Sequence, residues 1–100
     1  MRMVMEVSIP NEPFNDMVRE GTAGKTMQKA LEATKPQAAY FMEVNGLRTA
    51  LLIVDLKETS GIPALCEPWF LSFNAQCRLR PAMIPEDLAK SGIDQIGKSW

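Results

Sequence analysis

Hydrophobic residues occupy both faces of the stretch from Gln37 to Asp55 (QAAYFMEVNGLRTALLIVD). Two runs rich in aliphatic, aromatic and β-branched residues flank Asn45-Gly46, a dipeptide that favours a two-residue type I′ turn because both turn positions need positive φ. The pattern therefore predicts a β-hairpin in which residues equidistant from the turn face each other. Side chains alternate along a strand, so three predicted pairs share each face: Glu43 with Arg48, Phe41 with Ala50 and Ala39 with Leu52 on one face, and Met42 with Thr49, Tyr40 with Leu51 and Ala38 with Ile53 on the other.

Two further stretches alternate between apolar and polar residues with the period of two that is typical of strands. Arg2 to Ile9 (RMVMEVSI) places its methionines, Val7 and Ile9 on one face, and Ala75 to Pro81 (AQCRLRP) does the same with Cys77 and Leu79. We expect these apolar faces to lie under the helices. The polar face would then carry the remaining side chains of all four strands: Glu6, Ser8, Tyr40, Met42, Thr49, Leu51, Ile53, Asp55, Gln76, Arg78 and Arg80.

Apolar residues spaced three or four apart predict helices in the other parts of the chain. One helix is expected from Phe14 to Thr34, with a bend or a close approach to the sheet near residues 21 to 24, where two glycines weaken it. A second helix after residue 61 should be interrupted at Pro68, since a proline removes a helical hydrogen-bond donor. A last helix opens at Pro85, with Leu88, Ile93 and Ile96 as its apolar stripe.

The order of elements is β-α-β-β-α-β plus a C-terminal helix, the pattern of an α+β, ferredoxin-like fold with a four-stranded antiparallel sheet. Residues 1–100 form one domain, because a chain of this length supports a single core. A sheet that is apolar on both faces needs cover on both, and this chain supplies one layer of helices. We therefore expect a homodimer. The alternative is that the C-terminal helix, Pro85 to Trp100, folds over the open face of its own sheet.

The chain resembles the dimeric α/β-barrel superfamily, which includes muconolactone isomerases and antibiotic-biosynthesis-type monooxygenases. The residues that carry the resemblance are the hairpin AYFMEVNGLRTALLIVDLKE, the segment IPALCEPWFLSF and the closing NAQCRLRPAMIPEDL. The resemblance implies that two sheets pair face to face into a barrel around a small apolar cavity. It implies no catalytic signature that can be matched residue by residue.

Charge and composition narrow the range of partners. The 11 basic and 12 acidic residues give a net charge of −1, which leaves no electrostatic footprint for nucleic acid. No apolar run reaches the roughly 20 residues of a membrane span, and the first residues alternate like a strand, so we expect a cytoplasmic protein without a membrane segment. Cys66 and Cys77 are read as reduced and buried, and they have no neighbours at metal-ligand spacing, so neither a metal site nor a cofactor is predicted.

The candidate site lies on the polar face of the sheet. Glu6 and Arg78 are expected on neighbouring strands, where they can form a carboxylate–guanidinium pair, and Tyr40 can donate or accept one hydrogen bond; these three are the catalytic candidates. An apolar surface with a few convergent polar groups is typical of a small-molecule site. The ligand-binding candidates are Met42, Thr49, Leu51, Ile53 and Trp69. The simpler alternative is that the charged residues form subunit-interface ion pairs.

Several chemistries are excluded or disfavoured. The chain contains no histidine, which removes Ser-His-Asp and Cys-His mechanisms and histidine-bound metals. The segment EGTAGKT lacks the spacing of a phosphate-binding loop and falls within a helical pattern. Proton transfer would need a carboxylate in an apolar setting, for which Glu6 is the first candidate; Glu43, the second, is better explained as a cross-strand ion pair with Arg48.

Two functional hypotheses remain open. The first is a homodimer that binds a small, partly apolar or aromatic molecule in a sheet-lined cavity, as an isomerase or as a monooxygenase-like enzyme that needs no cofactor. The second is a non-catalytic binding or assembly module whose polar sheet face is only the subunit interface. The sequence alone does not decide whether the protein is an enzyme.

Overall fold

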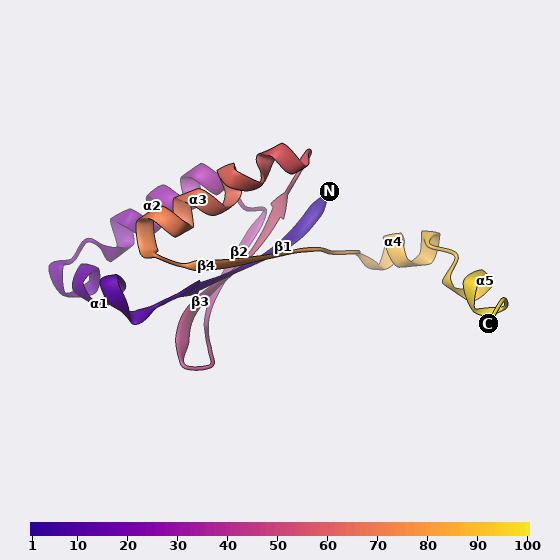
Figure 1. The fold of residues 1–100 in the computed structure, drawn as a ribbon, viewed down its shortest axis with the longest axis horizontal. Helices are drawn as coiled ribbons and strands as arrows, with labels where there is room; N and C mark the ends of the chain where they lie inside the picture. The colour runs from indigo at the N-terminus through magenta and orange to yellow at the C-terminus, as the bar shows by residue number, and fades with distance from the viewer.

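The computed structural model describes residues 1–100 and has an α+β fold, in which three helices lie on one side of a four-stranded antiparallel sheet (Figure 1). Two further short helices follow the last strand and lie away from the sheet. In chain order the elements are β1 (Arg2–Ile9), α1 (Asn11–Glu20), α2 (Ala23–Thr34), β2 (Ala38–Val44), β3 (Leu47–Asp55), the 3₁₀ turn η1 (Thr59–Gly61), α3 (Ile62–Phe73), β4 (Gln76–Pro81), α4 (Pro85–Lys90) and α5 (Ile93–Gly97).

The predicted hairpin and its register are confirmed. Asn45 and Gly46 both have positive φ, at 53° and 80°, and all six predicted cross-strand pairs are present. β1 pairs with β3 on one side and with β4 on the other, so the strand order is β2-β3-β1-β4. This order and the alternation of strands and helices are compatible with a ferredoxin-like fold. None of the helices is both long and apolar enough to cross a lipid bilayer.

The core lies between the sheet and α1, α2 and α3. The apolar face of β1 supplies Met5 and Val7, and α3 supplies Trp69 and Phe73, all of them fully buried. The ring of Phe73 lies 5.6 Å from that of Phe14 on α1, so one aromatic cluster joins two helices over the sheet. The alternation in β1 and β4 is therefore confirmed, with Cys77 and Leu79 packed against this core as expected.

The helix expected over residues 14–34 is two helices. Gly21 ends α1 with a φ of +78°, a conformation that side-chain-bearing residues rarely adopt, and the chain then starts α2 at Ala23. A Cβ atom added at Gly21 or Gly24 would meet no atom within 4 Å. The glycines thus allow the bend, and neither marks a close approach to the sheet.

The sequence predicted a kinked or restarted helical turn at Pro68, and the restart was wrong, because α3 is one helix from Ile62 to Phe73. Proline leaves the carbonyl four residues earlier without its helical partner, and here that carbonyl belongs to Ala64, an exposed residue that water can reach. Trp69 directly follows the proline, Phe73 lies one helical turn further on, and both side chains are fully buried in the core. Their packing keeps the helix continuous through the proline.

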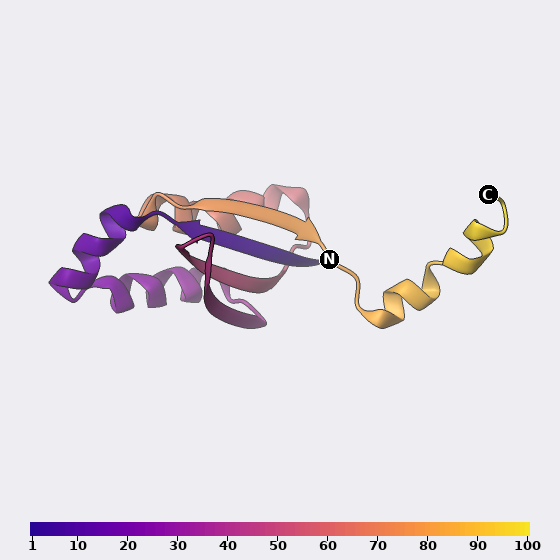
Figure 2. The same cartoon turned by 90° about the horizontal axis from the view of Figure 1, so that it is seen from below.

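The last helix is also divided in two, at Gly92, which has a φ of +73°. Residues 82–100, here called the C-terminal arm, leave the sheet at the end of β4 and project away from it (Figures 1 and 2). No residue of the arm is buried. The radius of gyration is 16.7 Å, against roughly 13 Å for a compact chain of 100 residues, and the longest extent is 59 Å. The arm therefore leaves the other face of its own sheet uncovered.

Candidate functional site

The side of the sheet turned away from α1, α2 and α3, here called the open face, is a grid of side chains built from all four strands. The register aligns these side chains in three rungs, read from β2 through β3 and β1 to β4. The rungs are Ala38–Ile53–Val4–Arg80, Tyr40–Leu51–Glu6–Arg78 and Met42–Thr49–Ser8–Gln76. All the residues that the sequence assigned to the polar face are found on the open face. Ten of the eleven lie in these three rungs, and Asp55 lies just beyond them, paired with Arg2.

The grid has two halves of different character. The half over β2 and β3 is apolar except for Thr49 and the hydroxyl of Tyr40, and the half over β1 and β4 is largely charged or polar. Adjacent strands are about 4.8 Å apart, so a molecule lying along one rung meets both halves within roughly 15 Å. This arrangement suits a molecule that has one apolar part and one polar or charged part.

The predicted neighbours Glu6 and Arg78 do form an ion pair. An Nη1 of Arg78 lies 3.5 Å from an Oε2 of Glu6, and the arginine side chain is half exposed. Arg80 is exposed and has no carboxylate within 4.0 Å. The free positive charge of the open face is therefore at Arg80.

Tyr40 lies on the same rung as Glu6 and Arg78 but is separated from them by Leu51 on β3. Its side chain is 58% exposed. Two strand spacings, about 10 Å, separate the tyrosine from the carboxylate, so the two groups do not contact each other. Together they can contact opposite ends of one bound molecule.

The ligand-binding candidates divide between the two sides of the sheet. Met42, Thr49, Leu51 and Ile53 lie together on the apolar half of the open face. Thr49 is only 2% exposed, and its hydroxyl donates a 3.1 Å hydrogen bond to the carbonyl oxygen of Leu47, so it is the least accessible of the four. Trp69 lies on α3, fully buried in the core on the other side, and its indole N–H has no hydrogen-bond partner. The structure brings the first four together and places Trp69 apart from them, because α3 packs its aromatic residues against the sheet.

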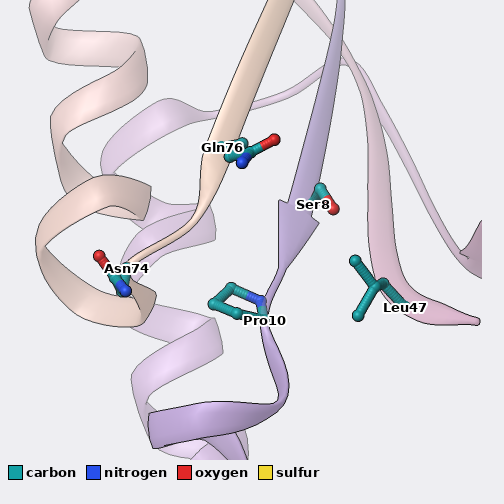
Figure 3. Close-up of a pocket in the computed structure, with 5 residues that line it drawn as sticks. All are labelled: Ser8, Pro10, Leu47, Asn74 and Gln76. Carbon is teal, nitrogen blue, oxygen red and sulfur yellow. The ribbon is translucent and has the colours of Figure 1, made fainter.

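A small pocket of about 200 Å³ lies at one end of this face (Figure 3). Ser8 on β1 and Gln76 on β4 face each other across the ladder, and Pro10, Leu47 and Asn74 complete the lining. Sequence reasoning placed Ser8 and Gln76 on the polar face without singling them out. The other three come from the ends of three different elements, and no motif in the sequence links them. Pockets that hold drug-sized ligands have about 300–1,000 Å³, so this one is too small to enclose such a ligand by itself.

The edge strand β2 is exposed on both of its faces. Tyr40 and Met42 on the open side and Phe41 on the helix side are 58%, 41% and 56% exposed. Phe41 is paired with Ala50, on the register that faces the helices, but the end of the hairpin extends away from the helical layer (Figure 1). An exposed apolar edge strand is a surface that native proteins usually cover.

The expected ion pair between Glu43 and Arg48 does not form, although the two residues face each other. Glu43 Oε2 accepts a hydrogen bond of 2.9 Å from the backbone N–H of Gly46, within the turn. Arg48 instead lies 4.8 Å above the ring of Phe14 and donates a 2.7 Å hydrogen bond to Asn15 Oδ1. Glu43 is thus bound within its own turn, and Arg48 is bound to residues of α1, so the two side chains do not pair with each other.

The two cysteines are free thiols and do not form a reactive pair. The Cys77 thiol donates a weak 4.0 Å hydrogen bond to the carbonyl oxygen of Cys66. Burial raises the pKa of the Cys77 thiol to about 12 and also raises the pKa of Cys66. A thiol with a raised pKa is a poor nucleophile. No three Cys, Asp or Glu side chains are arranged to hold a metal ion.

Comparison with protein-family models finds no match for this chain, and comparison with curated proteins finds none either.

Proposed function

We propose that the protein is a homodimer that binds a small, partly apolar or aromatic molecule on the open face, in a cavity that the second subunit completes. The observation that carries the proposal is the division of that face into an apolar half and a charged half over one continuous grid of side chains. The resemblance to the dimeric α/β-barrel superfamily points the same way.

The need for a second subunit follows from the shape of the site. One chain offers an exposed sheet and a pocket of about 200 Å³, neither of which can exclude water from a ligand. The exposed residues of β2 are also of the kind enriched at subunit interfaces, since aromatic residues and methionine are common there. A second copy over the open face would bury both surfaces at once.

Each polar group then has a defined role toward the ligand. Arg80, which has no carboxylate partner, would bind an anionic group of the molecule. Tyr40 would contact its other end, and Leu51 and Ile53 would contact its apolar part. Glu6 is the one carboxylate in the middle of the face and would accept a hydrogen bond or, in an isomerase, a proton.

The alternative function is an assembly module without a ligand, and the ion pair between Glu6 and Arg78 favours it. A carboxylate already paired with a guanidinium is less available for proton transfer, and such pairs also occur in structural networks. In that case the open face is only the surface through which two copies associate.

The test combines native mass spectrometry with binding of the anionic aromatic dye 1-anilinonaphthalene-8-sulfonate. The wild type is expected to be a dimer, to retain a small molecule from its expression host, and to bind the dye in competition with that molecule. Glu6→Gln and Tyr40→Phe should leave the dimer intact and abolish retention of the natural molecule. Arg80→Gln should weaken dye binding by about tenfold, because a charge-assisted contact is lost.

Arg19→Gln is the matched control, because Arg19 is an exposed arginine on α1, outside the open face. It should change neither dimer mass nor dye affinity. If Glu6→Gln and Tyr40→Phe instead change the dimer dissociation constant while no molecule is retained by any variant, the assembly function is correct and the ligand proposal is wrong.

A further inference from the structure

The C-terminal arm is a structured segment that has nothing to pack against in its own chain. It contains two helices of 6 and 5 residues, and helices shorter than about 12–15 residues are marginal in water unless they pack against another surface. One hydrogen bond and one ion pair tie the arm to the sheet: the N–H of Ala82 donates to the carbonyl oxygen of Arg2, and an Nη1 of Arg2 lies 3.7 Å from an Oδ2 of Asp87. Both are at the root of the arm and neither covers its apolar residues.

The arm carries a series of exposed apolar side chains. Leu88, Ile93 and Ile96 are about half exposed, and Trp100 is 99% exposed. Between α4 and α5 lies an open hollow of about 420 Å³, with Leu88 and Ile93 in its lining. Soluble proteins seldom leave such a run of large apolar residues in water without a partner.

The open face offers the complementary surface. Tyr40 and Met42 protrude from its apolar half, where they can enter a hollow such as the one on the arm. Charges without partners lie on both surfaces. Arg80 on the face has no carboxylate partner, and Asp94, in the lining of the hollow, has no basic partner; the unpaired Lys90 and Lys98 of the arm lie outside that lining. The arm and the face of one chain are both unpartnered because the arm projects away from its own sheet (Figure 2).

We propose that the arm of each subunit docks onto the open face of a second copy of the chain, with Leu88, Ile93 and Ile96 against its apolar residues and Asp94 near Arg80. The five N–H donors of that arginine allow it to bind the arm's carboxylate and the anionic group of a ligand together. This exchange is reciprocal, so each chain gives one arm and receives one. The inference rests on the homodimer of the proposed function but not on its ligand. It makes the partner's arm one wall of the cavity above the open face.

Paramagnetic broadening between two differently labelled chains tests the docking directly. A nitroxide is attached at Gln95→Cys on the arm of unlabelled protein, which is refolded together with ¹⁵N-labelled wild type that carries no nitroxide. Only contacts between chains are then observed. With the nitroxide chain in large excess, so that nearly every ¹⁵N-labelled chain has a nitroxide-bearing partner, we expect amides of β1, β3 and β4, Arg80 among them, to lose most of their peak intensity, while amides of α2 and α3 stay sharp. A nitroxide at Lys29→Cys on α2 is the control and should leave β1, β3 and β4 sharp.

A second pair of variants measures the contribution of the apolar contact. The double variant Ile93→Asp with Ile96→Asp should raise the dimer dissociation constant by about tenfold or more, because two side chains lose their burial. Ser99→Asp adds a charge to the same arm without removing an apolar group and should change it little. Sedimentation equilibrium measures both.

The outcomes separate this inference from the proposed function. Broadening of α2 and α3 alone, or no broadening in a sample that is dimeric, would show that the arm does not lie on the partner's open face. A monomer at all concentrations would refute the exchange together with the dimer. Broadening of the sheet in a protein that retains no small molecule would support the exchange and count against the ligand.

Discussion

The two faces of the sheet are built from alternate residues of the same four strands, yet only one of them is covered. Leu52 on β3 is fully buried under the helices, whereas its neighbour Leu51 points to the open face and is partly exposed. The two residues have the same chemistry and adjoining positions in one strand. Their burial differs because the chain has enough helix for one layer and places its remaining helical segment in the arm. The apolar character of a strand residue therefore shows that its side chain is favoured in a buried position. The number of helical layers in the chain determines whether that side chain is buried within one subunit.

The largest expected difference in stability is between the alanine variants of these two leucines. Leu52→Ala leaves a cavity in the core and should lower the free energy of unfolding by roughly 2–5 kcal/mol. Leu51→Ala should lower it by less than about 1 kcal/mol at protein concentrations where the chain is monomeric, because little of its surface is removed from water there. Urea unfolding monitored by circular dichroism measures both.

Protein concentration sharpens this contrast. If the open face is a subunit interface, the effect of Leu51→Ala should increase at concentrations where the wild type is dimeric, since association adds to apparent stability. If Leu51→Ala and Leu52→Ala lower the free energy of unfolding of the monomer equally, the two faces of the sheet are equally buried in solution, contrary to the structure.

Local patterns predicted the helix-covered face well, for reasons that are visible in particular residues. Asn45-Gly46 determines the turn, the turn determines the register, and the period of two determines which residues accompany Leu52. The bend near residues 21 to 24 was also expected, and the structure has it at Gly21. Two other features were not predicted. The continuity of α3 through Pro68 is favoured by the burial of Trp69 and Phe73, which the local sequence does not reveal, and the break at Gly92 uses a backbone angle that glycine permits but does not require.

An arginine on each face provides the second contrast. Arg48, from the helix-side register of β3, lies over Phe14 and donates to Asn15, so Arg48→Ala should cost about 1–2 kcal/mol of unfolding free energy. Arg78 on the open face has one half-exposed ion pair, with Glu6, and Arg78→Ala should cost about 0.5 kcal/mol in the monomer. Urea unfolding at low and high salt separates the two, because salt should weaken only the ion pair appreciably. If Arg78→Ala lowers the free energy of unfolding more than Arg48→Ala does, the open face contributes more to monomer stability than its exposure indicates.

The candidate site was only partly predictable. Pairing rules placed Glu6 beside Arg78 and put Met42, Thr49, Leu51 and Ile53 on one surface. They could not show that Arg80 lacks a partner or that Glu43 turns back to its own hairpin, because those outcomes depend on competition among several nearby groups. They also could not show where the arm would lie, since nothing within the arm's sequence determines the direction in which it leaves β4.

The smallest contrast is between two adjacent positions of β4, Cys77 toward the helices and Gln76 on the open face. Burial holds the pKa of the Cys77 thiol at about 12, so little thiolate forms at pH 8.5 and the native protein should react slowly with 5,5′-dithiobis(2-nitrobenzoate). In Gln76→Cys the added thiol is exposed and should react rapidly, while Cys77 stays slow. Rapid reaction of both thiols in the native state would mean that β4 opens to solvent on its helix side.

The same raised pKa gives stability a defined dependence on pH. Below pH 9.0, the ordinary pKa of the thiol, Cys77 is protonated in the folded and unfolded chains alike, and its contribution to stability is complete. Between that pH and about 12 the unfolded thiol ionises while the folded one does not, so the free energy of unfolding should fall as the pH rises. Urea midpoints measured from pH 8 to pH 10.5 should therefore decline less steeply in Cys77→Ala than in the wild type. Some decline should remain, because burial also raises the pKa of Cys66. Parallel slopes for the two proteins would show that the helix side of β4 is no less hydrated than its open side, and the distinction between the faces would fail at this edge of the sheet.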